Sequence, residues 1–204
     1  MNEKLYAVLK DEMMDACRAS LERHNGEDFY GISLYTCGEY LYLHDAFCTV
    51  EGLEKAARKY LKDEYYQRKW KNLDGAMQRL KWSSCDSPYH LEVGEIFDRT
   101  ADILDEIWES MDEQSSGHIK FNCQQIHNTC LTVLIDVRRS GLFDEDRVLF
   151  NLLKGDQSDE ERWANAKAVN SEKSLESYRK DMEMDERLVR EEFERLGERF
   201  EGYF

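Results

Sequence analysis

The sequence lacks both a long apolar segment and the opening of a secreted protein. In a chain of 204 residues, no run of about 18 apolar residues occurs. The first residues, MNEKLYAVLKDEMMDACR, carry too many charges for a signal peptide. We therefore expect a soluble, cytoplasmic protein without a membrane segment.

The short motifs that mark common chemical devices are also missing. The chain contains no GxGxxG, GxxxxGKS/T, HExxH or GxSxG. These motifs bind a dinucleotide, cradle nucleotide phosphates, hold a catalytic zinc or expose a nucleophilic serine. No internal repeat or low-complexity block is visible either. The sequence therefore indicates no reaction, and we expect no cofactor.

Cysteine is present, but in no pattern typical of disulfides. The six cysteines form no CxxC pair and most lie in apolar stretches: Cys17, Cys37, Cys48, Cys85, Cys123 and Cys130. We interpret them as reduced core residues of a cytosolic protein. Cys123, His127 and Cys130 would share one helical face, which suggests a zinc site. Three ligands on one straight helix seldom converge on one ion, so we expect no metal there.

The charge balance is strongly acidic. Asp and Glu number 43 and Lys and Arg number 28, which gives a formal net charge of −15. Such a charge repels nucleic acid and anionic membranes and attracts a basic protein partner. The alternative is that acidity only keeps the chain soluble. Hydrophobic residues at 41% and aromatic residues at 12% suffice for a sizeable core.

The residue pattern predicts a single α+β domain over residues 1–204, with a core at 1–155 and a helical C-terminal extension at 156–204 packed on it. Aromatic and branched residues favour strands at 29–35 and 40–43, and a period of 3.6 after Thr49 favours a helix reaching Trp70. Further strands are predicted at 76–82 and 147–153, and further helices at 2–23, 94–111, 119–139, 160–169 and onward from Ser171. The expected fold is a small antiparallel or mixed sheet of about four strands, covered by amphipathic helices, with a long C-terminal helix.

Several short segments resemble a known family. FYGISLYT, TVEGL at a helix start, LKWSSCD, and RVLF after GLFDED are similar to the bacterial family catalogued as domain of unknown function 4303. The resemblance spans residues 29–153. It implies no agreed activity, because the family has none. Members resemble small bacterial accessory proteins, some of which act as immunity partners of secreted toxins.

One predicted helix carries a regular row of carboxylates. On the helix at 94–111, acidic residues recur at three- and four-residue steps opposite the apolar face: Glu95, Asp98, Asp102, Asp105 and Glu109. Such a row could imitate nucleic-acid phosphates or receive the Lys and Arg of a basic protein, and the simpler interpretation is a solvated helix face. We expect a non-catalytic acidic protein-binding module. The most specific version of this expectation is an immunity protein that occludes a basic toxin. The acidic tail at 181–194 is the alternative binding surface.

A competing hypothesis is a hydrolase-like enzyme. The polar loop SSCDSPYHLEV holds the only proline. Its Cys85, Asp86 and His90 could serve as nucleophile, orienting carboxylate and base. A loop rich in Ser, Asp and Pro is also what an ordinary connection uses, and we favour that interpretation.

A third hypothesis is a structural subunit. The C-terminal helix spaces apolar residues by sevens: Leu175, Met182, Val189, Leu196 and Tyr203. We expect this stripe to dock on the protein's own core rather than to form a homodimer seam. Residues 55–81 oppose the overall charge, with nine basic residues against three acidic ones. That segment predicts an internal salt-bridge face or self-association, with single-stranded nucleic acid as a minor alternative.

Overall fold

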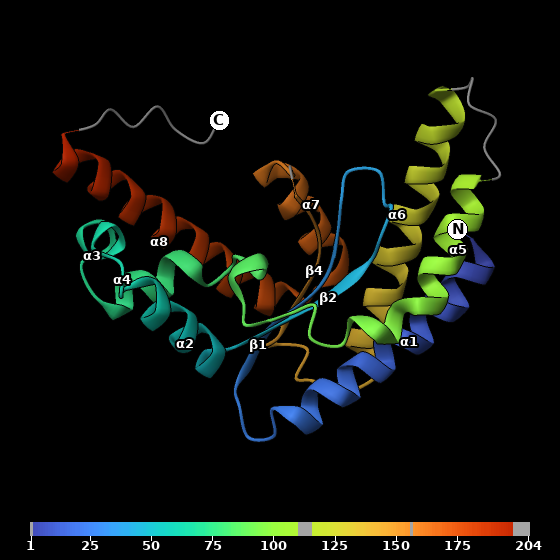
Figure 1. Cartoon of the computed structure of the whole chain (residues 1–204), viewed down its shortest axis with the longest axis horizontal. Helices are drawn as coiled ribbons and strands as arrows, with labels where there is room; N and C mark the ends of the chain where they lie inside the picture. Colours follow the sequence, from blue (N-terminus) through green and yellow to red (C-terminus); the bar gives the residue numbers. More distant parts are fainter. Residues whose placement is uncertain (1, 110–115, 156, 198–204) are drawn as a thin grey trace.

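The computed structural model describes residues 2–109, 116–155 and 157–197, and its strands form a four-stranded sheet (Figure 1). The order across the sheet is β3 (Tyr89–His90), β2 (His44–Thr49), β1 (Phe29–Thr36) and β4 (Leu149–Lys154). β1 runs antiparallel to β2 and parallel to β4, and β2 runs antiparallel to β3. The predicted α+β class with a small mixed sheet is therefore confirmed.

One face of the sheet carries the largest core. Ile32, Leu34, Phe47, Phe150 and Leu152 come from three strands, and all five are fully buried there. The elements that cover this face are α1 (Glu3–Arg23), the short η2 (Gly94–Phe97), α5 (Asp98–Glu109) and α6 (Ser116–Arg139). In Figure 1 the three helices lie together on one side of the sheet. This core fixes the position of α5.

The opposite face carries small side chains. Gly31, Ser33 and Ala46 alternate with the core residues of β1 and β2. Trp82 lies so close to Gly31 that an added Cβ would come within 3.4 Å of its ring. The helices on this side are α2 (Val50–Tyr60), α3 (Glu64–Trp70), α4 (Leu73–Leu80) and α8 (Glu172–Leu196), while α7 (Asp159–Val169) packs along β4 (Figure 1). None of the helices in the described ranges has the length and apolarity needed to cross a membrane.

The basic segment and the C-terminal helix neutralise one another. Lys81 Nζ lies 2.7 Å from Asp181 Oδ2, and Lys69 Nζ lies 3.3 Å from Glu192 Oε1. Arg79 forms a third ion pair, with Asp185 of α8. All six side chains are at least half covered, so these pairs are screened less than surface pairs. Three basic residues of the segment at 55–81 thus form ion pairs within the chain, of the kind the sequence predicts.

Removing the Asp181 carboxylate should weaken the packing of α8 on the rest of the chain. Its carboxylate forms an ion pair with Lys81 at 2.7 Å and accepts a hydrogen bond from the Trp82 indole N–H at 3.2 Å. Asp181→Ala leaves both donors without that acceptor, so the free energy of unfolding in urea should fall by about 2 kcal/mol. Glu186→Ala is the matched control, because it breaks only a pair with Arg190 on the same helix and should cost under about 0.5 kcal/mol. Equal losses in the two variants would contradict this account of α8.

The apolar stripe of α8 is used within the chain. Leu175, Tyr178 and Val189 are buried, and Met182 is packed against the cluster around Leu175. In this part of the stripe α8 therefore packs against β4 and α7 of the same chain. The side chain of Leu196, together with Tyr203, lies outside the part of the chain that the structure describes.

Two predicted strands are wrong. Residues 76–82 fall mainly in helix α4, because the Asn72 side chain accepts the backbone N–H of Gly75 and caps the helix, while Ala76 and Leu80 are buried one turn apart. Residues 40–43 belong to the connection before β2, where Tyr40 adopts a positive φ of 57°. β2 begins only at His44.

The other elements differ mainly at their ends. The helix predicted to reach Trp70 is interrupted after Tyr60, because the Asp63 side chain accepts the N–H of Tyr65 and starts α3. The helix starts predicted at Asn2 and Ser171 are confirmed, since these residues cap α1 and α8. The predicted strand at 147–153 and helices at 119–139 and 160–169 correspond to β4, α6 and α7. Residues 110–111 of the predicted helix 94–111 lie outside the described residues.

Candidate functional site

The five predicted carboxylates lie at the surface along η2 and α5. Glu95, Asp98, Asp102, Asp105 and Glu109 are all exposed. The last four recur along α5 at steps of four, three and four residues, so they share one helical face. Thr100, Ile103 and Leu104 point the other way and are buried. We call these five residues the acidic row.

Most of the acidic row has no counter-ion in the part of the chain that the structure describes. Glu95 lies 3.9 Å from Arg23, at the limit of an ion pair. No ion pair or side-chain hydrogen bond of Asp98, Asp102, Asp105 or Glu109 occurs within residues 2–109, 116–155 and 157–197. By contrast, Glu106 on the same helix pairs with Lys4 of α1. The row therefore presents uncompensated negative charge to solvent.

A buried carboxylate anchors the helix that carries the row. Glu12 of α1 is only 2% exposed. Its two oxygens accept the backbone N–H groups of Arg99 and Thr100, at 3.2 and 3.1 Å, as well as Arg99 Nε and the Thr100 hydroxyl. The carboxylate thus satisfies the first turn of α5, where the helix dipole also favours negative charge. Glu12 lies among the apolar positions Leu9 and Met13 of α1, and this misplaced charge is the sequence signal that could have identified it.

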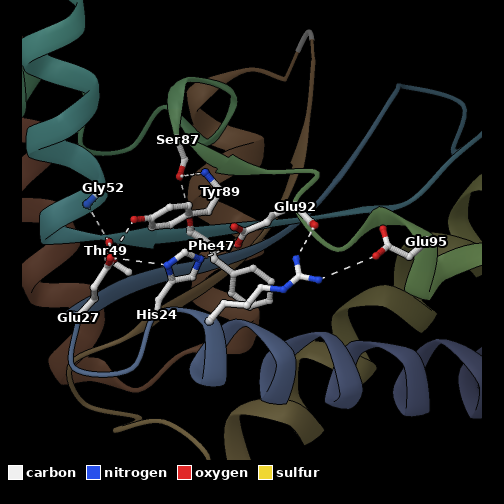
Figure 2. A network of polar contacts seen from close by, with 10 residues as sticks. His24, Glu27, Phe47, Thr49, Gly52, Ser87, Tyr89, Glu92 and Glu95 are labelled. Carbon is white, nitrogen blue, oxygen red and sulfur yellow. Dashed lines mark hydrogen bonds and ion pairs between the residues drawn. The ribbon is translucent and has the colours of Figure 1, made fainter.

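A second polar network, shown in Figure 2, fixes the chain that leads into η2. His24 stacks on Tyr89 with ring centroids 3.7 Å apart, and its Nε2 lies 2.6 Å from a Glu92 oxygen. Glu27 accepts the Tyr89 hydroxyl at 3.0 Å and the Thr49 hydroxyl at 2.6 Å. The network therefore ties the end of α1 to the start of α2 and to the loop before η2.

The same network also caps α2 and holds the backbone around it. The Thr49 hydroxyl also accepts the N–H of Gly52 as the cap of α2. Ser87 donates to the carbonyl oxygen of Phe47 and accepts the N–H of Tyr89. Burial, followed by the hydrogen bond to Glu27, raises the pKa of Tyr89 to about 12, so the phenol stays a donor at neutral pH. Arg23 then bonds the Glu92 carbonyl at 2.8 Å and brings the network next to Glu95 (Figure 2).

The three residues of the enzyme hypothesis are near one another in sequence but lie in different surroundings. Cys85 is exposed. Asp86 accepts the hydroxyls of Tyr60 and Ser83, and His90 packs edge-on against Tyr35 at 5.1 Å. In the described residues no hydrogen bond joins Cys85 to Asp86 or His90. Burial lowers the pKa of His90, and the three side chains form no hydrogen-bonded triad.

The three potential zinc ligands on α6 are also engaged elsewhere. His127 Nδ1 lies 2.6 Å from the Tyr40 hydroxyl. Cys130 is fully buried, and Cys123 faces the carbonyl oxygen of Glu39 at 3.9 Å. Across the described ranges no group of three His, Cys, Asp or Glu side chains is arranged to hold a metal ion.

The comparisons with known proteins identify the family. Residues 9–171 match the family model described as Domain of unknown function (DUF4303), and the chain belongs to that family. No curated protein and no solved structure matches the chain. The matched range includes the acidic row, the Glu12 anchor and the network of Figure 2. It ends at Ser171, so α8 lies beyond it.

Proposed function

We propose that this protein is a non-catalytic binding module whose acidic row receives a basic protein partner. The observation that supports this proposal is the set of four exposed carboxylates on one face of α5 that have no counter-ion among the described residues. A solvated helix commonly pairs such groups with lysine or arginine three or four residues away. α8 does so through pairs such as Glu176 with Lys180 and Glu186 with Arg190, and α5 does not.

The anchoring of α5 strengthens the argument. Binding costs less free energy when the contact groups are already held in place. Glu12 fixes the first turn of α5, and Ile103 and Leu104 pack its inner face into the core. The charged face is therefore presented on a firmly held helix, and its field adds to the net charge of −15.

The partner class that we propose is a toxin or effector, with this protein as the immunity protein that occludes it. The family resemblance and the acidity support this version. Free thiols at all six cysteines support a cytoplasmic location, where such a protein would intercept its target. Under this proposal a basic toxin's cationic cleft meets the acidic row. Cells that express the toxin should survive when the wild type is co-expressed.

Neutralising the row should slow association with the partner. The acidic-row variant carries Asp98→Asn, Asp102→Asn, Asp105→Asn and Glu109→Gln, which keep shape and remove charge. Its association rate at low salt should fall by about tenfold or more, because long-range attraction controls that rate. The difference should shrink as salt rises, and the variant should lose protection in the co-expression assay.

The control removes as many charges elsewhere. The α8 variant carries Glu172→Gln, Glu183→Gln, Glu191→Gln and Glu194→Gln, all of them exposed. It also tests the alternative surface at 181–194. Association rates that fall equally in both variants would mean that only net charge matters and would refute a specific role of α5.

A further inference from the structure

A groove of about 870 Å³ lies far from the acidic row, between α7 and α8. The two helices are joined at residues 170–171 and diverge from there (Figure 1). The ends of β1 and β4 form the floor, with Tyr35 and Leu153 paired side by side, and residues 82–85 close one end. The volume falls within the range of small-molecule sites, which is roughly 300–1,000 Å³.

The small side chains of this sheet face leave the space open. Gly31, Ser33, Cys48 and Asn151 lie below the groove, where a further small hollow lies beneath Trp82. Large residues at these positions would fill the layer between the sheet and α8. Trp82 and Trp163 instead stand at the sides, and both pack against Tyr178 of α8. The groove is therefore lined by aromatic side chains from the sheet and from both sides.

Arg162 of α7 is a weakly compensated cation in the groove. Its side chain is 31% exposed, and its ion pair with Asp159 measures 3.7 Å, longer than a hydrogen bond. Its Nε is buried and has no hydrogen-bond partner in the described part of the chain. A buried donor left without an acceptor costs about 1–3 kcal/mol, and more when it is charged. An anion bound in the groove would compensate this charge through the exposed part of the Arg162 side chain.

Other donors lie in the same groove. Arg179 of α8 reaches Glu183 only at 4.0 Å and is 59% exposed. The indole N–H of Trp163 donates to no acceptor among the described residues, whereas that of Trp82 is taken by Asp181. The remaining acids of the groove wall are already engaged, Asp185 by Arg79 and Glu186 by Arg190. Donors that lack acceptors therefore come from both walls.

We propose that this groove binds a small molecule that carries one anionic group, a phosphate or a carboxylate, on a planar ring. Arg162 holds the anion and Arg179 assists from the opposite helix, because guanidinium groups match both anions in a bidentate geometry. Trp163 contacts the ring. Asp159 and Glu183 also line the groove, and their repulsion limits the ligand to a single anionic group near Arg162.

The test uses two matched pairs of probes with the full chain. Adenosine monophosphate is compared with adenosine, and benzoate with benzamide, so that each pair differs in the anion. The indole N–H signals of Trp82 and Trp163 are followed by NMR, with Trp70 and Trp108, which do not line the groove, as internal controls. We expect at least one anionic probe to shift the groove signals, with an affinity at least about tenfold above that of its neutral counterpart.

Variants then assign the contact. Arg162→Gln should lower the affinity for the anionic probe by about tenfold, and Arg162→Lys should retain part of that affinity. Arg187→Gln, which lies outside the groove on α8, should leave the affinity unchanged. A response to the phosphate alone or to the carboxylate alone supports the site and identifies its anion. The proposal is overturned if no anionic probe moves the groove signals at about 10 mM, or if Arg162→Gln, with native indole signals, binds as tightly as the wild type.

Discussion

Replacing Glu12 with alanine is expected to lower the free energy of unfolding by about 3 kcal/mol or more. The substitution removes a buried acceptor of four hydrogen bonds from Arg99 and Thr100. Arg99 is 60% exposed and can regain water, but Thr100 is fully buried. Its N–H and hydroxyl would remain without an acceptor at the start of α5, and this unsatisfied pair accounts for most of the expected loss.

Two controls make this result interpretable. Glu12→Gln keeps an acceptor oxygen and should lose about half as much stability. Asp15→Ala removes an exposed carboxylate from the same helix, where it pairs only with Arg18 at the surface, and should cost under about 0.5 kcal/mol. Urea unfolding measures all three, and hydrogen exchange should show faster opening of α5 in Glu12→Ala. If Glu12→Ala lost no more stability than Asp15→Ala, the anchoring role would be wrong.

The wild type should lose stability relative to Asp45→Asn as the pH rises from about 4 to about 7. Asp45 of β2 is fully buried, and neither side-chain oxygen has a partner at hydrogen-bonding geometry within the described residues. Burial raises the pKa of its carboxyl group from 3.8 to about 6, and the backbone N–H groups of Val93 and Glu92 oppose this rise only in part. The folded state therefore binds the proton more tightly than the unfolded state does.

The sign and size of this effect follow from the two pKa values. The protonated Asp45 carboxyl contributes to the free energy of unfolding. This contribution is fully present below pH 3.8 and is lost as the pH rises through about 6. A difference of about two pH units corresponds to about 3 kcal/mol. The asparagine in Asp45→Asn cannot ionise, and all other titrating groups are common to both proteins. The pH dependence of the difference in the free energy of unfolding between the two proteins therefore reports on Asp45 alone. Urea unfolding at several pH values measures it, and a difference that stays constant with pH would show that Asp45 is not held in an apolar site.

The sequence predicted correctly those features that depend only on residues close together in the chain. The caps Asn2 and Ser171 act within four residues of themselves, and the acidic row follows from helical spacing alone. The strand predicted at 40–43 was wrong because buried aromatic residues also occur in loops. Tyr40 is 2% exposed, yet it packs from a connection onto α6 and bonds His127. Burial, not strand pairing, explains the aromatic residue there.

Long-range contacts explain what the sequence could not predict. The residues of the Glu12 anchor are 87 and 88 positions apart. The groove depends on the parallel pairing of β1 with β4, which places Tyr35 beside Leu153. No local pattern indicates either contact. The groove also needs α8 for one wall, and α8 lies beyond the family match, whereas the acidic row lies within it.

The most direct test of the proposed binding role is a quantitative capture from the native cell. Tagged wild type, acidic-row variant and α8 variant are compared side by side at low and high salt, with mass spectrometry of the retained proteins. The account predicts that one basic protein is retained stoichiometrically by the wild type and the α8 variant at low salt. That protein should be lost from the acidic-row variant and released from all three at high salt. Equal retention by the acidic-row variant, or no basic protein on the wild type, would contradict the account.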